Sequence, residues 1–478
     1  MQGEGEKKGH AVVIPYPLQG HVIPAVHLAI KLATEGLTVT FVNTEAVHRR
    51  TSTARHTAAA GSGDDDDIFE GVRSAAGLDI RYELVSDGLP ADFDRSSNHD
   101  QFMLALLHVS SAHVESLLRR ISCRHPPPTC LIADTFFVWP AALSSKFGLL
   151  HASFWTEPAL VFSLYYHLDL LRYYGHFASS ENNREDAIDY VPGVGAMDPG
   201  DLMSYLQEKD TSSVVHQIIF RAFEGAKAAD LVLCNTAEEL EPATVAALRR
   251  EKPFYTVGPL FPAGFPTSPV KTSMWPEANC AQWLATRPRG TVLYVSFGSY
   301  AQLRRGDLEE IAMGVLQSGV SFLWALRPGI AGAGEGEPLP LALAEGGGGG
   351  RGLVVPWCNQ AAVLSNDAVG GFLSHCGWNS VLESIWCGVP LLCFPLLTDQ
   401  FTNRKLVVDE WRIGLEVSGR GSAARREEVA RKIGLLMGGG AARDSLDAAM
   451  KEARGALASA GGSSRRNLDQ FILDLKAR

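Results

Sequence analysis

Two runs in which short apolar segments alternate with helix-like segments constrain the fold of this chain most strongly. In the first run, the apolar stretch HAVVIPYP is followed by a turn at LQGH, by apolar residues at helical spacing from Ile23 to Leu32, and then by LTVTFV. Gly36 ends the helical stretch. Strand, helix and strand within about 35 residues form a βαβ unit, which requires neighbouring strands to be parallel.

The same rhythm recurs along most of the chain. Further strands are expected at TCLIAD, LLHASFW and DLVLCN, and later at TVLYVSFG, SFLWAL, GLVVPW, GGFLSH and PLLCFP, with a helix near residues 307–318. Two such runs predict an α/β fold of two facing, doubly wound, Rossmann-like domains with the active site in the cleft between them. The Pro-rich stretch 255–277 has the composition of a linker, so we expect domains at 1–254 and 278–460.

Composition excludes several classes of function. The chain has 478 residues, 46% of them hydrophobic, and a formal net charge of −10, which argues against nucleic acid as the partner. The polar N-terminus shows no signal peptide and no apolar run approaches the length of a membrane span, so a cytoplasmic location without membrane insertion is expected. The eight cysteines form no CxxC pair and are expected to be free thiols.

Two low-complexity stretches are expected to be surface loops. Residues 61–67 (GSGDDDD) contain a DxD pattern, but the absence of a framing strand argues against a metal site. The glycine run within 332–350 lacks the strand-turn-helix context of a dinucleotide fingerprint. PLQGH also stands where an oxidoreductase of this fold would have GxGxxG in its first βα turn, which argues against that class.

The segment 357–400 carries most of the polar residues suited to a nucleotide. GGFLS is a strand that leads into HCGWNS, and SVLESIWCG is a helix closed by Gly388, so His375 and Asn379 lie where a strand becomes a helix N-terminus. Free backbone N–H groups at that position attract phosphate, although Asn or Ser there can equally be a simple N-cap. Glu383, four residues after Asn379, shares its helix face and could accept hydrogen bonds from ribose hydroxyls.

Other polar or aromatic residues of this segment also follow strands. Trp357 comes after GLVVP and could stack on a flat base, whereas Asp399 and Gln400 come after PLLCFP and suit sugar hydroxyls. A single Trp more often serves packing. As a set, however, these residues lie at the carboxyl ends of parallel strands, where open α/β sheets bind ligands.

A histidine and an aspartate of the first run end strands at the same edge. His21 follows the first strand and Asp134 ends CLIAD. An Asp bonded to a His fixes the tautomer of the ring and stabilises its protonated form, so the two could form a general base. Position alone does not separate this dyad from two unrelated residues.

The segment 357–400, 44 residues with Trp, Gln, HCGWNS, Glu and a terminal Asp-Gln, resembles the signature box of the plant family 1 UDP-glycosyltransferases of secondary metabolism. The resemblance extends from PLQGH to the closing helix and implies the fold of two Rossmann-like domains known as GT-B. It also implies that residues 461–478 form a C-terminal helix that packs back on the N-terminal domain.

The resemblance implies a role for each residue of the site. His21 is the base and Asp134 its partner; UDP is bound by Ser299, Trp357, Cys358, Gln360, His375, Asn379, Ser380 and Glu383; and the sugar is contacted by Thr156, Trp378, Asp399 and Gln400. In this family a terminal Gln tends to accompany glucose donors and a His galactose donors, which leaves other UDP-sugars open. Asn359 departs from the usual Pro, which should alter loop stiffness more than chemistry.

The reaction implied is inverting transfer of glucose from UDP-glucose to a hydroxyl of a small lipophilic acceptor by a monomer that needs no metal or other cofactor. The acceptor, a flavonoid, phenolic, terpenoid or hormone, is expected to contact Leu89, Phe137, Phe154 and Leu202, although apolar residues there could equally be core. Transfer to a carboxylic acid, nitrogen or sulfur stays open, as does a protein that binds a UDP-sugar without turnover.

Overall fold

The computed structural model describes residues 9–58, 67–179, 183–331, 350–419 and 423–476. The N-terminus up to residue 8, the acidic run at 61–66 and the glycine-rich stretch at 332–349 lie outside these residues.

The N-terminal domain is built on a seven-stranded parallel sheet with the order β3-β2-β1-β4-β5-β6-β7. Every residue of the inner strands is buried, which explains why their sequences are continuous apolar runs. The strands are β1 (His10–Ile14), β2 (Thr38–Thr44), β3 (Ile80–Val85), β4 (Cys130–Asp134), β5 (Leu150–Trp155), β6 (Leu231–Cys234) and β7 (Phe254–Thr256).

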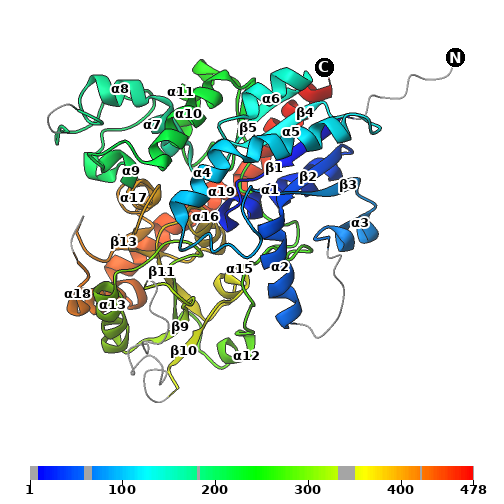
Figure 1. The fold of residues 1–478 in the computed structure, drawn as a ribbon. Helices are drawn as coiled ribbons and strands as arrows, with labels where there is room; N and C mark the ends of the chain where they lie inside the picture. The colour runs from blue at the N-terminus through cyan, green and yellow to red at the C-terminus, as the bar shows by residue number, and fades with distance from the viewer. Residues whose placement is uncertain (1–8, 59–66, 180–182, 332–349, 420–422, 477–478) are drawn as a thin grey trace.

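Helices cover both faces of this sheet (Figure 1). They are α1 (Gln19–Thr34), α2 (Glu45–Ala58), α3 (Glu70–Ala76), α4 (His99–His108), α5 (Ser110–Ile121), α6 (Pro140–Phe147), α7 (Ala159–Tyr166), α8 (Leu168–Tyr173), the 3₁₀ turn η1 (Pro199–Asp201), α9 (Ser204–Gln207), α10 (Val214–Ala228) and α11 (Pro242–Glu251).

The C-terminal domain has a six-stranded parallel sheet with the order β10-β9-β8-β11-β12-β13. Its strands are β8 (Val292–Ser296), β9 (Ser321–Ala325), β10 (Gly352–Val355), β11 (Val369–Ser374), β12 (Leu391–Cys393) and β13 (Gly414–Glu416). Its helices are α12 (Ala281–Leu284), α13 (Arg305–Ser318), α15 (Gln360–Leu364), α16 (Trp378–Cys387), α17 (Gln400–Lys405), the π-helical η2 (Leu406–Glu410), α18 (Arg426–Met437) and α19 (Ala441–Lys476).

The order of strands reverses between β1 and β4 in one sheet and between β8 and β11 in the other. Ligands of open α/β sheets bind outside the carboxyl ends of the strands at such points. The two parallel sheets confirm the predicted fold class and direct attention to the loops after these four strands.

Two domain boundaries differ from the prediction. Strand β7 pairs with β6 and ends at Thr256, so the linker begins after this residue instead of at 255, and Val257, Leu260 and Val270 are buried in the N-terminal core. The C-terminal helix begins at Ala441 instead of 461. The helix runs through Gly461 and Gly462, because packing at both ends of α19 outweighs the poor helix propensity of glycine.

Helix α19 belongs to both domains (Figure 1). Its first half contributes Met450 and Leu457 to the core that contains α16, and its second half contributes Leu468 and Phe471 to the core of the N-terminal sheet. A helix of 36 residues is about 54 Å long, which is enough to reach across both domains.

A buried ion pair also joins the domains. Arg404 of α17 pairs with Asp201 of η1, and their side chains are only 4% and 2% exposed. The Thr402 hydroxyl donates to the Asp201 carbonyl at 2.6 Å. On the outer side of Arg404, carboxylate oxygens of Asp409 and Glu416 lie at 3.1 and 3.7 Å.

Among the described residues, no helix is long and apolar enough to cross a membrane.

Candidate active site

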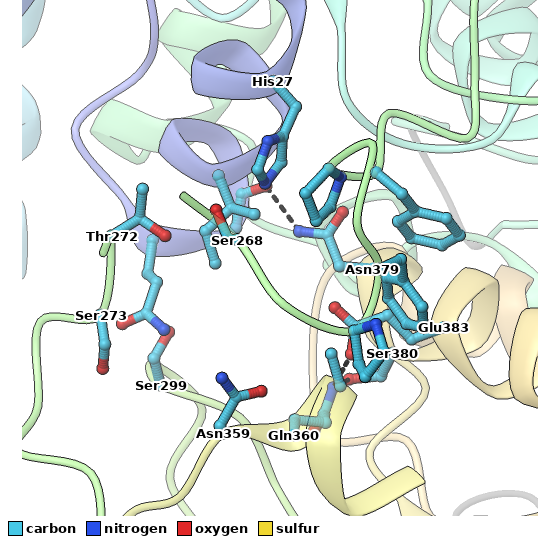
Figure 2. A pocket seen from close by; sticks show the side chains of 18 of the residues that line it. His27, Ser268, Thr272, Ser273, Ser299, Asn359, Gln360, Asn379, Ser380 and Glu383 are labelled. Carbon is cyan, nitrogen blue, oxygen red and sulfur yellow. Dashed lines mark hydrogen bonds between the residues drawn. The ribbon is translucent and has the colours of Figure 1, made fainter. Parts of the chain in front are cut away.

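Two cavities lie between the domains and meet at three residues. The first, of about 390 Å³, is lined mainly by α1, the linker and the segment 357–383 (Figure 2). The second, of about 210 Å³, lies on the side of β1, α7 and α10. Gly20, Ser299 and His375 line both, so a molecule in one cavity touches the wall of the other.

His375 follows β11 and is held between two glycines. A Cβ atom added at Gly298 would lie 2.5 Å from its Nε2 atom, and one at Gly377 would lie 2.6 Å away. Burial lowers the pKa of His375 to about 4, so the ring is neutral at pH 7. The next residue, Cys376, has a φ of +67°, a strained value that fixes how the strand turns into α16.

The N-terminus of α16 opens into the first cavity. Ser380 and Asn379 line that cavity, and the Asn379 amide also donates to the Gly20 carbonyl at 2.8 Å, across the domain boundary (Figure 2). Because Gly377 caps the helix without a side-chain bond, the first backbone N–H groups are left for an anion.

A half-buried amide–carboxyl pair lies beside this helix start. The Gln360 amide donates to the Glu383 carboxyl at 2.9 Å and to the Ser380 hydroxyl at 3.0 Å (Figure 2). Burial raises the pKa of Glu383 to about 7, whereas the bond from Gln360 lowers it. The pair therefore offers hydrogen-bonding groups suited to neighbouring hydroxyls of a sugar ring.

Trp357 and Cys358 form another part of the first cavity. The Trp357 ring lies 6.2 Å from that of Trp275, at an angle of 32°. Asn359 does more than alter loop stiffness, because its side chain caps α15 by accepting from the Ala362 N–H at 3.0 Å.

Asp399 and Gln400 line the second cavity at the start of α17. Asp399 accepts hydrogen bonds from Thr398 at 2.8 Å and from Asn403 at 2.6 Å. The Gln400 carbonyl oxygen accepts from the backbone N–H groups of Leu396 and Leu397, which leaves its amide N–H₂ as the donating end.

Trp378 and Thr156 both make polar contacts within the protein. The Trp378 indole is buried at the edge of the first cavity and donates to the Asn235 carbonyl at 2.7 Å. The Thr156 hydroxyl lies 2.9 Å from the Nδ1 atom of His21 and lines neither cavity.

His21 and Asp134 are in direct contact. The Nδ1 atom of His21 lies 2.8 Å from an Asp134 carboxylate oxygen, and the other oxygen accepts from the Phe136 N–H at 3.0 Å. The aspartate is almost fully buried, and the histidine ring lines the second cavity. With Nδ1 facing the carboxylate, Nε2 is the atom that can accept a proton.

The wall of the second cavity is aromatic and aliphatic. None of the four residues expected to contact the acceptor lines either cavity. Phe137 packs on Trp139, Phe154 and Leu202 are core residues, and Leu89 packs against a hydrophobic cluster of the N-terminal domain. The residues that do line the apolar part are Tyr16, Met103, Phe136, Tyr165, Tyr205, Val215, Ile218, Ile219 and Tyr300.

The sequence offered no signal for most of these, because pocket and core residues are equally apolar. Glu157 is the exception. It also lines the second cavity and stands out in the sequence as the only charged residue in the apolar stretch SFWTEPALVF. No group of three or more His, Cys, Asp or Glu side chains among the described residues is arranged to hold a metal ion.

Comparisons with known proteins agree with this geometry. Residues 263–420 match the family model described as UDP-glucoronosyl and UDP-glucosyl transferase. UDP-glycosyltransferase 86A2 of Arabidopsis thaliana is 55% identical over 97% of this chain and 94% of its own length.

Solved structures share the whole fold. Os79 from O. sativa in complex with UDP superposes with a TM-score of 0.79 at 26% identity, covering 97% of this chain and 100% of that one. A UDP-glucosyltransferase from Polygonum tinctorium capable of glucosylating indoxyl gives a TM-score of 0.78 at 27% identity over 99% and 100% of the two chains.

Proposed function

Because this chain belongs to the plant family 1 UDP-glycosyltransferases, we propose that it transfers glucose from UDP-glucose to a hydroxyl of a small lipophilic acceptor, with inversion at the anomeric carbon. The observation that carries the proposal is the contact between His21 and Asp134 at the wall of a cavity that adjoins the nucleotide cavity.

In the proposed reaction, the second cavity holds the acceptor with its hydroxyl at Nε2 of His21. The ring takes the hydroxyl proton while the oxygen attacks the anomeric carbon and the bond to UDP breaks. Asp134 stabilises the imidazolium that forms. One displacement on an α-linked donor gives a β-glucoside, UDP and a protonated His21, which then releases its proton to water.

The first cavity would hold UDP. The diphosphate would lie at the N-terminus of α16, near Asn379, Ser380, Ser299 and His375, and the developing negative charge would be stabilised there without a metal ion. The ribose would bond to Glu383 and Gln360, and the base would lie beside Trp357 and the Cys358 backbone.

Two findings support glucose as the sugar. The donating end of Gln400 and the carboxyl of Asp399 line the second cavity, next to the residues that both cavities share. The similar protein from Polygonum tinctorium is a UDP-glucosyltransferase. Glucose esters and N- or S-glucosides are further products to look for, because a carboxylic acid, amine or thiol could take the place of the reacting hydroxyl beside His21.

A kinetic comparison tests the proposal. Wild type and His21→Ala are incubated with UDP-glucose and a panel of phenols, terpenoid alcohols and hormones, and both UDP release and product mass are recorded. The variant should lose at least about 10²-fold in kcat while its affinity for UDP, measured by calorimetry, stays unchanged. His113→Ala, on the exposed side of α5, is the matched control.

Two results would count against the proposal. Equal rates for His21→Ala and wild type would remove His21 as the base. UDP binding without UDP release from any acceptor would favour a protein that binds a UDP-sugar without turnover. The coupling constant of the anomeric proton shows whether the product is the β-glucoside, as inversion requires.

A further inference from the structure

Glu157 lines the second cavity, and its half-buried side chain makes no hydrogen bond to another described residue. Its Oε2 atom is buried and unbonded, and the residue lines the cavity together with Tyr165 and Asp399. An unsatisfied buried carboxyl is costly, so its presence needs an explanation.

The position of Glu157 is fixed by its neighbours in the chain. The preceding Thr156 contacts His21, and the following Pro158 caps α7 and accepts a hydrogen bond from the Trp155 indole at 2.9 Å. The backbone of Glu157 is therefore held between a residue that contacts His21 and the N-cap of α7.

Comparison with Glu241 shows that the Glu157 carboxyl does not cap a helix. Glu241 is also buried next to α7, but its carboxyl accepts from the N–H groups of Ala159 and Leu160 and from the Thr236 hydroxyl. Two of these bonds cap the first turn of α7. Glu157 makes none of them, so its hydrogen-bonding capacity is left for a molecule in the cavity.

We propose that Glu157 determines acceptor specificity by donating a hydrogen bond to a carbonyl or ether oxygen of a neutral acceptor, separate from the hydroxyl that reacts. This inference rests on the proposed function, because it assigns the second cavity to the acceptor.

The surroundings favour the protonated, donating form of this carboxyl. Burial raises the pKa of Glu157 well above its usual range, and the carboxyls of Asp399 and Asp134 raise it further. The other titratable groups near it are Tyr165 of α7 and Cys234 of β6.

Positive charge that could favour the carboxylate is scarce. Among the described residues that line the cavity, none is Lys or Arg. The histidines are His21, His99 and His375, and His375 is neutral at pH 7. A carboxylate would therefore be stabilised only by a cationic acceptor, which is the competing explanation.

Matched phenols distinguish the two explanations. Each carries a para side chain with a methylene, a ketone or a primary amine at the same position, in lengths of three to five carbons. A ketone oxygen only accepts, so it can bond to a protonated carboxyl but not to a carboxylate. Initial rates with UDP-glucose are measured for wild type, Glu157→Gln and Glu157→Leu, and UDP affinity confirms that each variant is folded.

Wild type should prefer the ketone over the methylene compound by about tenfold in kcat/KM, the factor for one net hydrogen bond between neutral groups. Glu157→Gln, whose amide also donates, should keep the preference, and Glu157→Leu should lose it. In wild type the preference should fall as the pH rises and Glu157 ionises, whereas in Glu157→Gln it should stay constant. Comparing two acceptors at each pH cancels pH effects that are common to both reactions.

Three outcomes would overturn the inference: an equal ketone preference in wild type and Glu157→Leu, a preference for the amine that both variants lose, and an effect confined to the KM for UDP-glucose. If wild type glucosylates neither these phenols nor any compound of the wider panel of phenols, terpenoid alcohols and hormones, the proposed function itself fails.

Discussion

Replacing Asp201 with alanine should destabilise the protein far more than the loss of one surface charge. The substitution leaves the Arg404 guanidinium, only 4% exposed, without its buried partner. Breaking a buried ion pair costs about 3–5 kcal/mol. Because Asp409 and Glu416 remain within 4 Å of Arg404, we expect the lower end, a loss of about 3 kcal/mol in the free energy of unfolding.

Urea denaturation followed by tryptophan fluorescence measures this loss. Glu428→Ala is the control, because Glu428 pairs with Arg431 on the surface of α18, where the side chains are 37% and 57% exposed. That change should cost about 0.5 kcal/mol or less. Asp201→Leu combined with Arg404→Met should recover much of the loss, since no buried charge is left unpaired. Equal destabilisation by Asp201→Ala and Glu428→Ala would refute the reasoning.

The remaining predictions concern the nucleotide cavity and α19. Gly298→Ala should lower kcat/KM by about a hundredfold, because the new methyl group displaces the His375 ring. Glu383→Gln should remove a pH dependence of stability, because the pKa of Glu383 in the folded state, about 7, lies above its value in the unfolded chain. As the pH rises from 4.5 to 7, the free energy of unfolding of wild type should fall by up to about 3 kcal/mol relative to that of the variant. Phe471→Ala should cost about 3–5 kcal/mol of stability, because its ring is fully buried in the N-terminal core.

Matched changes control these three. Gly290→Ala has a similar positive φ but open space around it, so it measures strain without the clash; if it reduces kcat/KM as much as Gly298→Ala, displacement of the imidazole is not the cause. Denaturation of wild type and Glu383→Gln at both pH values gives their free energies of unfolding, and an equal pH dependence of the two proteins would contradict the prediction. Leu473→Ala, 60% exposed on the same helix as Phe471, should change stability by about 0.5 kcal/mol or less.

The parts of the fold that the sequence predicted are those buried on both faces. The strands β1, β4, β8 and β11 are continuous apolar runs, because helices cover both sides of each sheet. The edge strand β3 and the three-residue strands β7 and β13 were missed. Residues along β3 are mostly half-buried, and β7 and β13 have only three residues each. Strand β12 is equally short but lies within the apolar run PLLCFP, which made it recognisable in the sequence.

The two sides of the candidate site differ in how far the sequence describes them. Apart from Ser299, the residues proposed to bind UDP come from one continuous segment, 357–383, with polar residues at strand ends, so they could be named from the sequence. The proposed acceptor side comes from seven separate segments of the chain, and neighbouring residues diverge: Phe136 lines the cavity, whereas Phe137 packs on Trp139. Apolar composition cannot distinguish the two, since both require the same side chains.

Helix α19 has a consequence for exchanging halves between relatives. Acceptor specificity in such enzymes is naturally explored with chimaeras cut in the linker, which keep the whole C-terminal half of one parent. In this fold, that half would bring the second part of α19, with Leu468 and Phe471, into the core of a foreign N-terminal domain. A chimaera should therefore carry two junctions, one after Thr256 and one within α19, so that each sheet keeps the stretch of helix that evolved against it.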